Sequence, residues 1–268
     1  MKVILRVLLI AALFSEAYAQ KLPNVQQVSL RAPANIKIDG KATECDDKFA
    51  AYNGTTQVYY TISNDDDLLY LTLKATDFTT IKKILAAGII LTINPQNKKK
   101  DSTITTAVSF PYYSTGQQPM SISAQLAAKS NLNKIQLDSF ATEYNRQIPA
   151  HFKLIGVQGA NGIKDTFVSI YNEDGIKVAA AFNKDMSYIC ELALPLKLLG
   201  DKAGPSTFNY NLQINGQTTF NGYAITPVQG RSNLLTFTDD KGTRFMLDQD
   251  AKDLYYPTDF WGEYTLAK

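Results

Sequence analysis

The stretch YYTISNDDDLLYLTLKATD, residues 59–77, alternates apolar and polar side chains on both sides of a short acidic segment. Alternation with a period of two, carried by β-branched and aromatic residues, is typical of half-buried β-strands. Asn and Asp favour turns because their side chains hydrogen-bond the nearby backbone. We therefore predict a β-hairpin with strands at Thr56–Ser63 and Leu68–Thr76, joined by a tip at Asn64-Asp65-Asp66-Asp67.

The same acidic segment has a second interpretation, as a cation site formed by its carboxylates. A calcium loop places its ligands at alternate positions, as in D-x-D-x-D-G. The three aspartates here are consecutive and do not follow that spacing. The hairpin tip is the preferred interpretation, and a cation contact at the tip is the alternative.

The alternation recurs in short segments along the rest of the chain. The further candidate strands are Val28–Arg31, Ile36–Ile38, Gly88–Ile93, Thr103–Phe110, Phe152–Val157, Thr166–Tyr171, Lys177–Phe182, Ser187–Leu194, Thr207–Ile214 and Asp259–Leu266. Asn-Gly and Asp-Gly pairs, which suit tight turns, fall between many of these segments. We therefore predict an all-β fold, a two-sheet antiparallel β-sandwich of jelly-roll or immunoglobulin-like type with a few short helical turns.

Helical signal is scarce. Apolar residues in Phe78–Ala87 have nearly helical spacing, so this segment is expected to bridge two strands. Ser121–Ser130 and Pro195–Leu199 are each expected to form a turn or two. Residues 114–150 form the least regular stretch, which we interpret as a long excursion from the sandwich.

The first residues have the features of a secretory signal peptide. A basic start with Lys2 and Arg6 precedes the apolar run Val7–Phe14, and Ala17-Tyr18-Ala19 is an A-x-A cleavage site. The apolar run is far shorter than the roughly 20 residues that cross a bilayer. We therefore predict a signal peptide at residues 1–19, no transmembrane segment, and a single secreted or periplasmic domain at residues 20–268.

Charge and composition exclude several functions. The formal net charge is +2 for the whole chain, so no basic surface is available to neutralise nucleic-acid phosphates. His151 is the only histidine, which excludes a histidine metal cluster and makes any Ser-His-Asp triad depend on that residue. No glycine-rich phosphate loop or G-x-S-x-G motif is present. We predict a protein that is not an enzyme and binds no nucleic acid.

A glycoside-acting enzyme that uses two carboxylates is an alternative. Glu44, Asp46 and Asp47 lie together in an acidic segment and supply the residue type. A solvated loop is the preferred interpretation of this segment.

Four motifs follow one another in a recognisable order. They are IKIDGKATECDDKF (36–49), VYYTISNDDDLLYLTLKATD (58–77), GIILTINPQNKKK (88–100) and YICELALPLKLLG (188–200). This succession resembles the family 9 carbohydrate-binding modules and their DOMON-like relatives. The positions that match are Ile38-Asp39-Gly40, Asp67-Leu68-Leu69-Tyr70, Thr92-Ile93-Asn94-Pro95 and Glu191-Leu192-Ala193-Leu194-Pro195. The resemblance implies an antiparallel β-sandwich that binds carbohydrate.

The chain departs from that family at the sugar site. Sugar-binding members hold a terminal sugar between two exposed Trp side chains, whereas this chain has one Trp, Trp261, and Cys45 where many relatives have a Trp. We predict that Trp261 lies in the core of a closing strand, and the sequence assigns no ligand-binding residue. A structural or interaction domain that has lost the sugar site is therefore the alternative function.

The DOMON-like resemblance also implies a haem-binding alternative. Some relatives hold haem through one Met and one His. His151 with Met120, Met186 or Met246 supplies those residue types, but no spacing singles out a pair.

Two further sites are candidates. Asp248, Asp250 and Asp253 form a dense acidic region that suits structural calcium, which is common in the resembled family; a solvated loop is the alternative. Cys45 and Cys190 are the only cysteines, and an exported chain favours a disulfide between them. The alternative is two small buried thiols.

Overall fold

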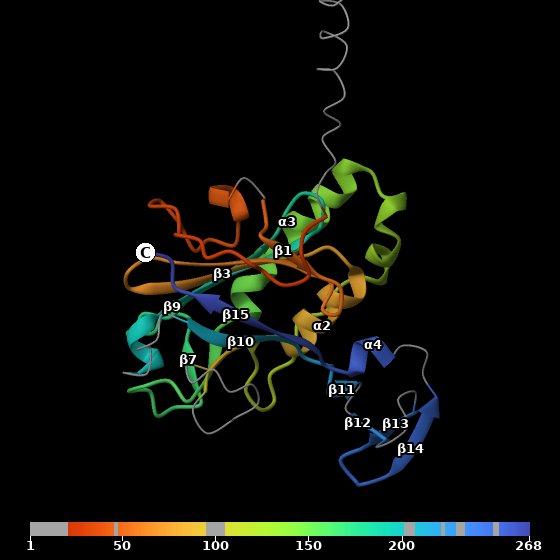
Figure 1. Ribbon diagram of the computed structural model, residues 1–268. Helices are drawn as coiled ribbons and strands as arrows, with labels where there is room; N and C mark the ends of the chain where they lie inside the picture. The colour runs from red at the N-terminus through yellow and green to blue at the C-terminus, as the bar shows by residue number, and fades with distance from the viewer. Residues whose placement is uncertain are drawn as a thin grey trace, which may run out of the picture.

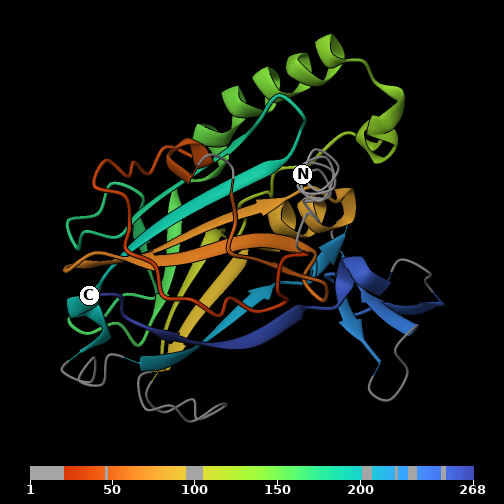
Figure 2. The same cartoon turned by 45° about the horizontal axis from the view of Figure 1, so that its top comes forward.

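A computed structural model describes residues 21–45, 48–94, 105–200, 207–220, 223–228, 234–248 and 252–268. Two antiparallel β-sheets pack face to face in these ranges, and a third, smaller sheet lies at one end (Figures 1 and 2). The predicted all-β sandwich is confirmed. No helix in the described ranges has the length and apolar character needed to cross a membrane.

The first sheet has five strands in the order β1-β2-β3-β9-β8. Their bounds are β1 Ala51–Asn53, β2 Val58–Asn64, β3 Leu68–Ala75, β8 Lys177–Phe182 and β9 Tyr188–Pro195. The second sheet has six strands in the order β15-β10-β4-β5-β6-β7. Their bounds are β4 Ile89–Asn94, β5 Thr106–Tyr112, β6 Leu154–Gln158, β7 Phe167–Ser169, β10 Thr207–Ile214 and β15 Thr258–Thr265.

The acidic segment forms the tip of the β2–β3 hairpin, as predicted. Ser63 pairs with Tyr70 and Asn64 with Leu69, and the chain reverses between them. One carboxylate oxygen of Asp65, Oδ1, accepts hydrogen bonds from the backbone N–H groups of Asp67 (2.8 Å) and Leu68 (2.7 Å). These bonds close the turn by the mechanism that favours Asp in turns.

The main core lies between the two large sheets. Tyr60 of β2 and Tyr210 of β10 meet there, and their hydroxyl groups are 2.9 Å apart. The backbone N–H of Gln26 also donates to the Tyr60 hydroxyl at 2.9 Å. Both phenol oxygens therefore have partners, which removes much of the cost of burying them.

Three helical segments match their predictions. The helix α2 spans Phe78–Ala87, is capped by the Asp77 side chain and joins the two sheets. The 3-10 segments η4, Ala124–Asn131, and η5, Leu196–Leu199, form at the other two predicted places. A further 3-10 turn, η2, spans Ala42–Cys45.

The helix α3, Lys134–His151, contradicts the prediction of an irregular excursion with only short helical turns. It lies across the edge of the sandwich beside β8 (Figure 2). Its apolar pattern is sparse, since only Ala141, Tyr144 and Ile148 are buried in it. The sequence feature that could have predicted this helix is at its N-terminus, where Asn133 and Gln136 form a reciprocal capping box.

The third sheet is also a feature that the sequence reading missed. It consists of β11 Thr219–Phe220, β12 Tyr223–Pro227, β13 Leu234–Thr238 and β14 Arg244–Asp248, followed by the short helix α4 Lys252–Tyr255. Its small separate core contains Ile225, Leu235, Phe237, Leu254 and Tyr255. Figure 1 shows this sheet extending from the end of the sandwich near α2 and α4.

Two predicted strands near the N-terminus do not form. Val28–Arg31 and Ile36–Ile38 have no strand assignment, and the structure gives this segment one isolated bridge, between Arg31 and Asn64. Backbone hydrogen bonds at the same place join Ala32 N–H to Asn64 O and Asn64 N–H to Leu30 O. The segment therefore borders the hairpin without adding a strand to the sheet.

Candidate functional site

The outward face of the second sheet carries an unusual row of side chains. Successive strand pairings place Gln213, Ile90, Ser109, Gly156 and Phe167 side by side across β10, β4, β5, β6 and β7. Side chains alternate between faces along a strand, and the neighbours of these residues point into the core. The middle of the row is formed by small residues, so the sheet surface is hollowed there.

Tyr112 reaches this face because β5 is irregular. The register between β5 and β6 shifts between Ser109 and Tyr112, and a shift of this kind re-aims the side chains that follow it. A Cβ atom at Gly156 would overlap the Tyr112 ring and the Ser109 hydroxyl. The Tyr112 ring thus lies directly against the glycine backbone, and it stacks on Phe167 with ring centroids 5.6 Å apart.

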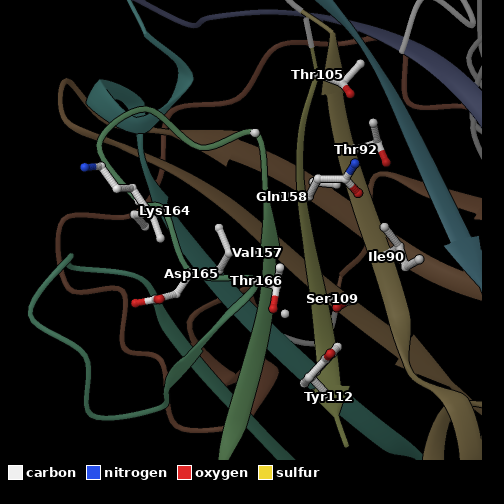
Figure 3. Close-up of a pocket in the computed structure, with 14 residues that line it drawn as sticks. Ile90, Thr92, Thr105, Ser109, Tyr112, Val157, Gln158, Lys164, Asp165 and Thr166 are labelled. Atoms are coloured by element: carbon white, nitrogen blue, oxygen red, sulfur yellow. The ribbon is translucent and has the colours of Figure 1, made fainter. Parts of the chain in front are cut away.

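A first hollow of about 640 Å³ lies over β4, β5 and β6. Figure 3 shows Thr92, Thr105 and Gln158 toward one end of it and Ser109 and Tyr112 toward the other. The loop between β6 and β7, with Lys164, Asp165 and Thr166, forms its remaining side. The described lining is mainly hydroxyl, amide and small apolar groups.

A second hollow of about 650 Å³ continues from the first. The two hollows share Ile90, Ser109 and Tyr112 as lining residues. The second extends past Gln213 of β10 to the chain before the third sheet, and Ile225 and Tyr255 of the third-sheet core form part of its wall. We call the two hollows together the outer groove.

Hydrogen bonds hold the polar wall of the second hollow in place. The Gln213 amide donates to Asn215 Oδ1 (2.6 Å), and the Asn215 amide donates to the carbonyl of Ala87 (2.9 Å). Burial raises the pKa of Tyr113 to about 12, although a hydrogen bond from the Met120 N–H works to lower it. The Tyr113 hydroxyl therefore stays protonated and donates to the carbonyl of Leu85.

The sequence reading assigned no residue of this groove. The signal that could have found it is the lack of charge on the outward positions of the two central strands. Residues 88–94 and 105–113 contain no charged residue, whereas the solvent face of an antiparallel sheet is normally polar and often charged. The uncharged outward positions of these central strands are therefore the sequence signal that marks the groove.

Trp261 does not lie in the core, so that prediction is wrong. Phe260 and Tyr264 of β15 point into the sandwich, and Trp261 lies half-buried on the opposite face of the strand. Strand pairing places Trp261 beside Asn211, and Asn211 beside Thr92 of the first hollow. The single Trp therefore lies on the same face of the sheet as the outer groove.

The predicted calcium ligands lie largely outside the described residues. Asp250 is in that undescribed part, and so are the side chains of Asp248 and Asp253, whose backbones belong to β14 and α4. In the rest of the described chain, no group of three or more His, Cys, Asp or Glu side chains is placed to hold a metal ion. The calcium site stays a prediction.

Cys190 is a free, buried cysteine. It points into the main core, whereas its neighbour Ile189 points to the other face of β9 and packs with Ala42. The turn Ala42–Cys45 therefore lies on the face of the sheet opposite to the Cys190 thiol. The Cys45 side chain is outside the described residues, so the disulfide stays a prediction.

The residues proposed for haem do not form a recognisable pair. Met120 and Met186 are buried in the main core, while Met246 is 62% exposed on the third sheet. The half-buried His151 ends α3, and its Nδ1 lies 3.2 Å from the carbonyl of Gln147. The haem alternative stays untested and gains no support from these contacts.

Three of the four motifs that carried the family resemblance contact one another at the first sheet. Glu191 is 2% exposed, and one of its oxygens accepts from the N–H groups of Asp39 (3.0 Å) and Gly40 (2.8 Å). Burial raises the pKa of Glu191 to about 7, against the lowering effect of these two bonds. In the second motif, the backbone carbonyl of Asp67 accepts from the N–H of Leu196 just after β9.

These contacts give the motifs a structural role. They fasten the N-terminal segment and the hairpin tip to β9, on the sheet that does not carry the outer groove. A scan against protein-family models gives no match for this chain. A search of the curated proteins gives no match either.

Proposed function

We propose that this protein is a non-catalytic binding module that recognises glycan or other carbohydrate-bearing surface material through the outer groove. The observation that carries the proposal is the continuous hollow over the uncharged central strands β4 and β5, with Tyr112 at the junction of its two halves. The resemblance to family 9 carbohydrate-binding modules supports the same function, although the binding residues differ.

The chemistry of the groove suits a sugar. An aromatic ring packs well against the apolar C–H face of a pyranose, and Tyr112 offers such a ring in both hollows, with the 41% exposed Phe167 stacked on it. Amide and hydroxyl side chains both donate and accept hydrogen bonds, as sugar hydroxyl groups require. Gln158, Thr92 and Ser109 supply these groups in the first hollow.

The groove offers little for catalysis on a glycosidic bond. Hydrolysis of that kind uses two carboxylates on either side of the bond. Among the described lining residues of the groove, Asp165 is the one carboxylate. A binding role therefore fits the groove better than the glycoside-acting alternative, and the predicted signal peptide fits action outside the cytoplasm, secreted or periplasmic.

A binding screen tests the proposal. The mature protein is applied to a panel of glycans and insoluble polysaccharides, with calcium and with EDTA, alongside the Tyr112→Ala variant. Tyr171→Ala is the matched control, because Tyr171 is 86% exposed and lies outside the groove. We expect binding by the wild type and the control and its loss in Tyr112→Ala; equal binding by all three proteins would reject the groove.

An interaction domain is the second candidate function, and one observation favours it. Phe245 and Met246 of β14 are 40% and 62% exposed on the third sheet. Their side chains point to opposite faces of β14, an edge strand of the third sheet, so each face offers one exposed apolar side chain to another protein. If no glycan binds and Tyr112→Ala changes nothing, this candidate becomes the better one.

A further inference from the structure

We infer that the outer groove binds an internal stretch of an uncharged polysaccharide chain, with several sugar units in contact at once. This inference rests on the proposed function and specifies its ligand. It differs from recognition of a terminal sugar, because the ligand would run across the sheet and leave the groove at both ends.

The dimensions of the groove support a ligand longer than one sugar. Gln158 belongs to the first hollow alone and Gln213 to the second alone. The strands that carry them, β6 and β10, are separated by β5 and β4. Three strand spacings of about 4.8 Å give a path of roughly 14 Å between these strands, longer than one pyranose ring.

The position of Tyr112 supports a chain that passes through both hollows. Its side chain lines each of them, and it is fixed from below by Gly156 and from one side by Phe167. A rigid aromatic side chain at the centre of a contact surface is the usual form of a binding hot spot. A sugar unit stacked on Tyr112 would have neighbours on each side.

The charge of the groove supports a neutral ligand. The second hollow has no charged residue in its described lining. The first has Lys164 and Asp165, adjacent in sequence and opposite in sign, on the loop side away from Ile90 and Thr92 (Figure 3). An anionic chain would need several unopposed Lys or Arg groups to balance its desolvated charges.

The amide wall of the second hollow is ordered before the ligand arrives. Gln213, Asn215 and the carbonyl of Ala87 form a chain of hydrogen bonds, so their side-chain entropy is already lost. Pre-ordered polar groups gain affinity because less freedom is lost on binding. The second hollow therefore offers fixed polar partners to a sugar unit that lies in it.

Calorimetric titration with oligosaccharides of graded length tests the inference. The probes are neutral gluco-, manno-, xylo- and galacto-oligosaccharides, from monosaccharide to hexasaccharide, and oligogalacturonides of the same lengths. We expect at least one neutral series to bind, with an affinity that rises by roughly tenfold or more from disaccharide to hexasaccharide. The oligogalacturonides should bind at least roughly tenfold more weakly at equal length.

Variants confined to one hollow sharpen the test. Gln158→Ala and Gln213→Ala should each weaken hexasaccharide binding by several-fold, whereas only one of them should affect a disaccharide that fills a single hollow. Tyr112→Ala should weaken every length by roughly tenfold or more, with Tyr171→Ala as the unaffected control. Thermal unfolding of each variant checks its fold, and the exposed Gln158 keeps the test informative if Tyr112→Ala fails to fold.

The possible failures can be told apart. Tighter binding of oligogalacturonides than of neutral chains, or a monosaccharide that binds as well as a hexasaccharide, would overturn this inference and leave glycan binding intact. Binding of neither class, with all variants equivalent to the wild type, would overturn both the inference and the proposed function.

Discussion

Phe260 and Trp261 are neighbours in β15 whose side chains point to opposite faces of the strand. Phe260 is buried against Tyr60 and Tyr210, at ring-centroid distances of 5.1 Å and 6.2 Å. We expect Phe260→Ala to lower the free energy of unfolding by about 3–5 kcal/mol. Trp261→Ala should cost on the order of 1–2 kcal/mol, because its indole is partly exposed to solvent on the outer face of the strand.

Denaturant unfolding of the two variants and the wild type measures this difference. The same samples, titrated with a neutral oligosaccharide, show whether the binding surface extends from the groove to Trp261. A larger stability loss for Trp261→Ala than for Phe260→Ala would contradict the placement of the indole on the outer face.

Glu191 gives the stability of the protein a predictable pH dependence. The ordinary pKa of a glutamate carboxyl group is 4.5, and burial raises the pKa of Glu191 to about 7 in the folded chain. Between these two values the folded state binds a proton that the unfolded state has lost. The contribution of Glu191 to stability is therefore most favourable below about pH 4.5, falls as the pH rises, and is fully lost above about pH 7.

Thermal unfolding across that pH range, with the Glu191→Gln variant beside the wild type, isolates this effect. The variant cannot ionise at this position and keeps a group able to accept from the N–H groups of Asp39 and Gly40. We expect its stability relative to the wild type to increase from pH 4.5 to pH 7. A difference that stays constant with pH would show that Glu191 titrates normally.

At the scale of elements, the β2–β3 hairpin tip depends on one aspartate of its three. Asp65 accepts from the N–H groups of Asp67 and Leu68 and from the Tyr70 hydroxyl, while Asp66 is exposed and pairs with Arg31. Burial works to raise the pKa of Asp65, but these hydrogen bonds outweigh it and lower the pKa. Asp65→Ala should therefore destabilise the protein by roughly 1–3 kcal/mol, and Asp66→Ala by less than about 1 kcal/mol.

Chemical unfolding of both variants at neutral pH, with and without calcium, measures these losses. The turn interpretation requires the cost of Asp65→Ala to be the same in the two conditions. A stabilisation of the wild type by calcium that disappears in both variants would instead support the cation site at the tip.

The elements that the sequence predicted well are those whose pattern reports burial directly. Lys177–Phe182, Thr207–Ile214 and Phe78–Ala87 form at the predicted bounds. Their side chains alternate, or repeat with helical spacing, against one continuous core. The helix α3 and the third sheet were missed because each buries few side chains, so tertiary contact and capping decide their structure more than periodicity does.

The candidate site could not be predicted from the sequence for a related reason. The groove is defined by which strands are neighbours, and its row from Gln213 to Phe167 joins residues from five strands. The order of strands in a sheet depends on long-range pairing that no local pattern reports. The turn residues, in contrast, helped to predict the fold, and of the resemblance motifs only the third, residues 88–100, contributes to the described lining of the groove, through Ile90 and Thr92.

At the scale of the whole molecule, the third sheet is a small structure attached to a large one. Its core consists of Ile225, Leu235, Phe237, Leu254 and Tyr255, whereas the sandwich core runs through both large sheets. Its contact with the sandwich includes α4 against α2. So small a core is insufficient for independent stability, and the sheet is expected to open at a lower free energy than the sandwich.

This attachment also links the third sheet to the site, because Ile225 and Tyr255 line the second hollow. Leu235→Ala removes a fully buried side chain, at a cost of about 2–5 kcal/mol to the local structure. We expect faster amide hydrogen exchange in β12 and β13, with β3, β9 and β10 unchanged. Hexasaccharide binding should weaken as in Gln213→Ala, while disaccharide binding in the first hollow persists.

The matched variant Leu73→Ala, in the sandwich core, should instead raise exchange throughout both large sheets. If Leu235→Ala accelerates exchange equally in all three sheets, the chain unfolds as one cooperative unit and the third sheet cannot adjust the groove independently.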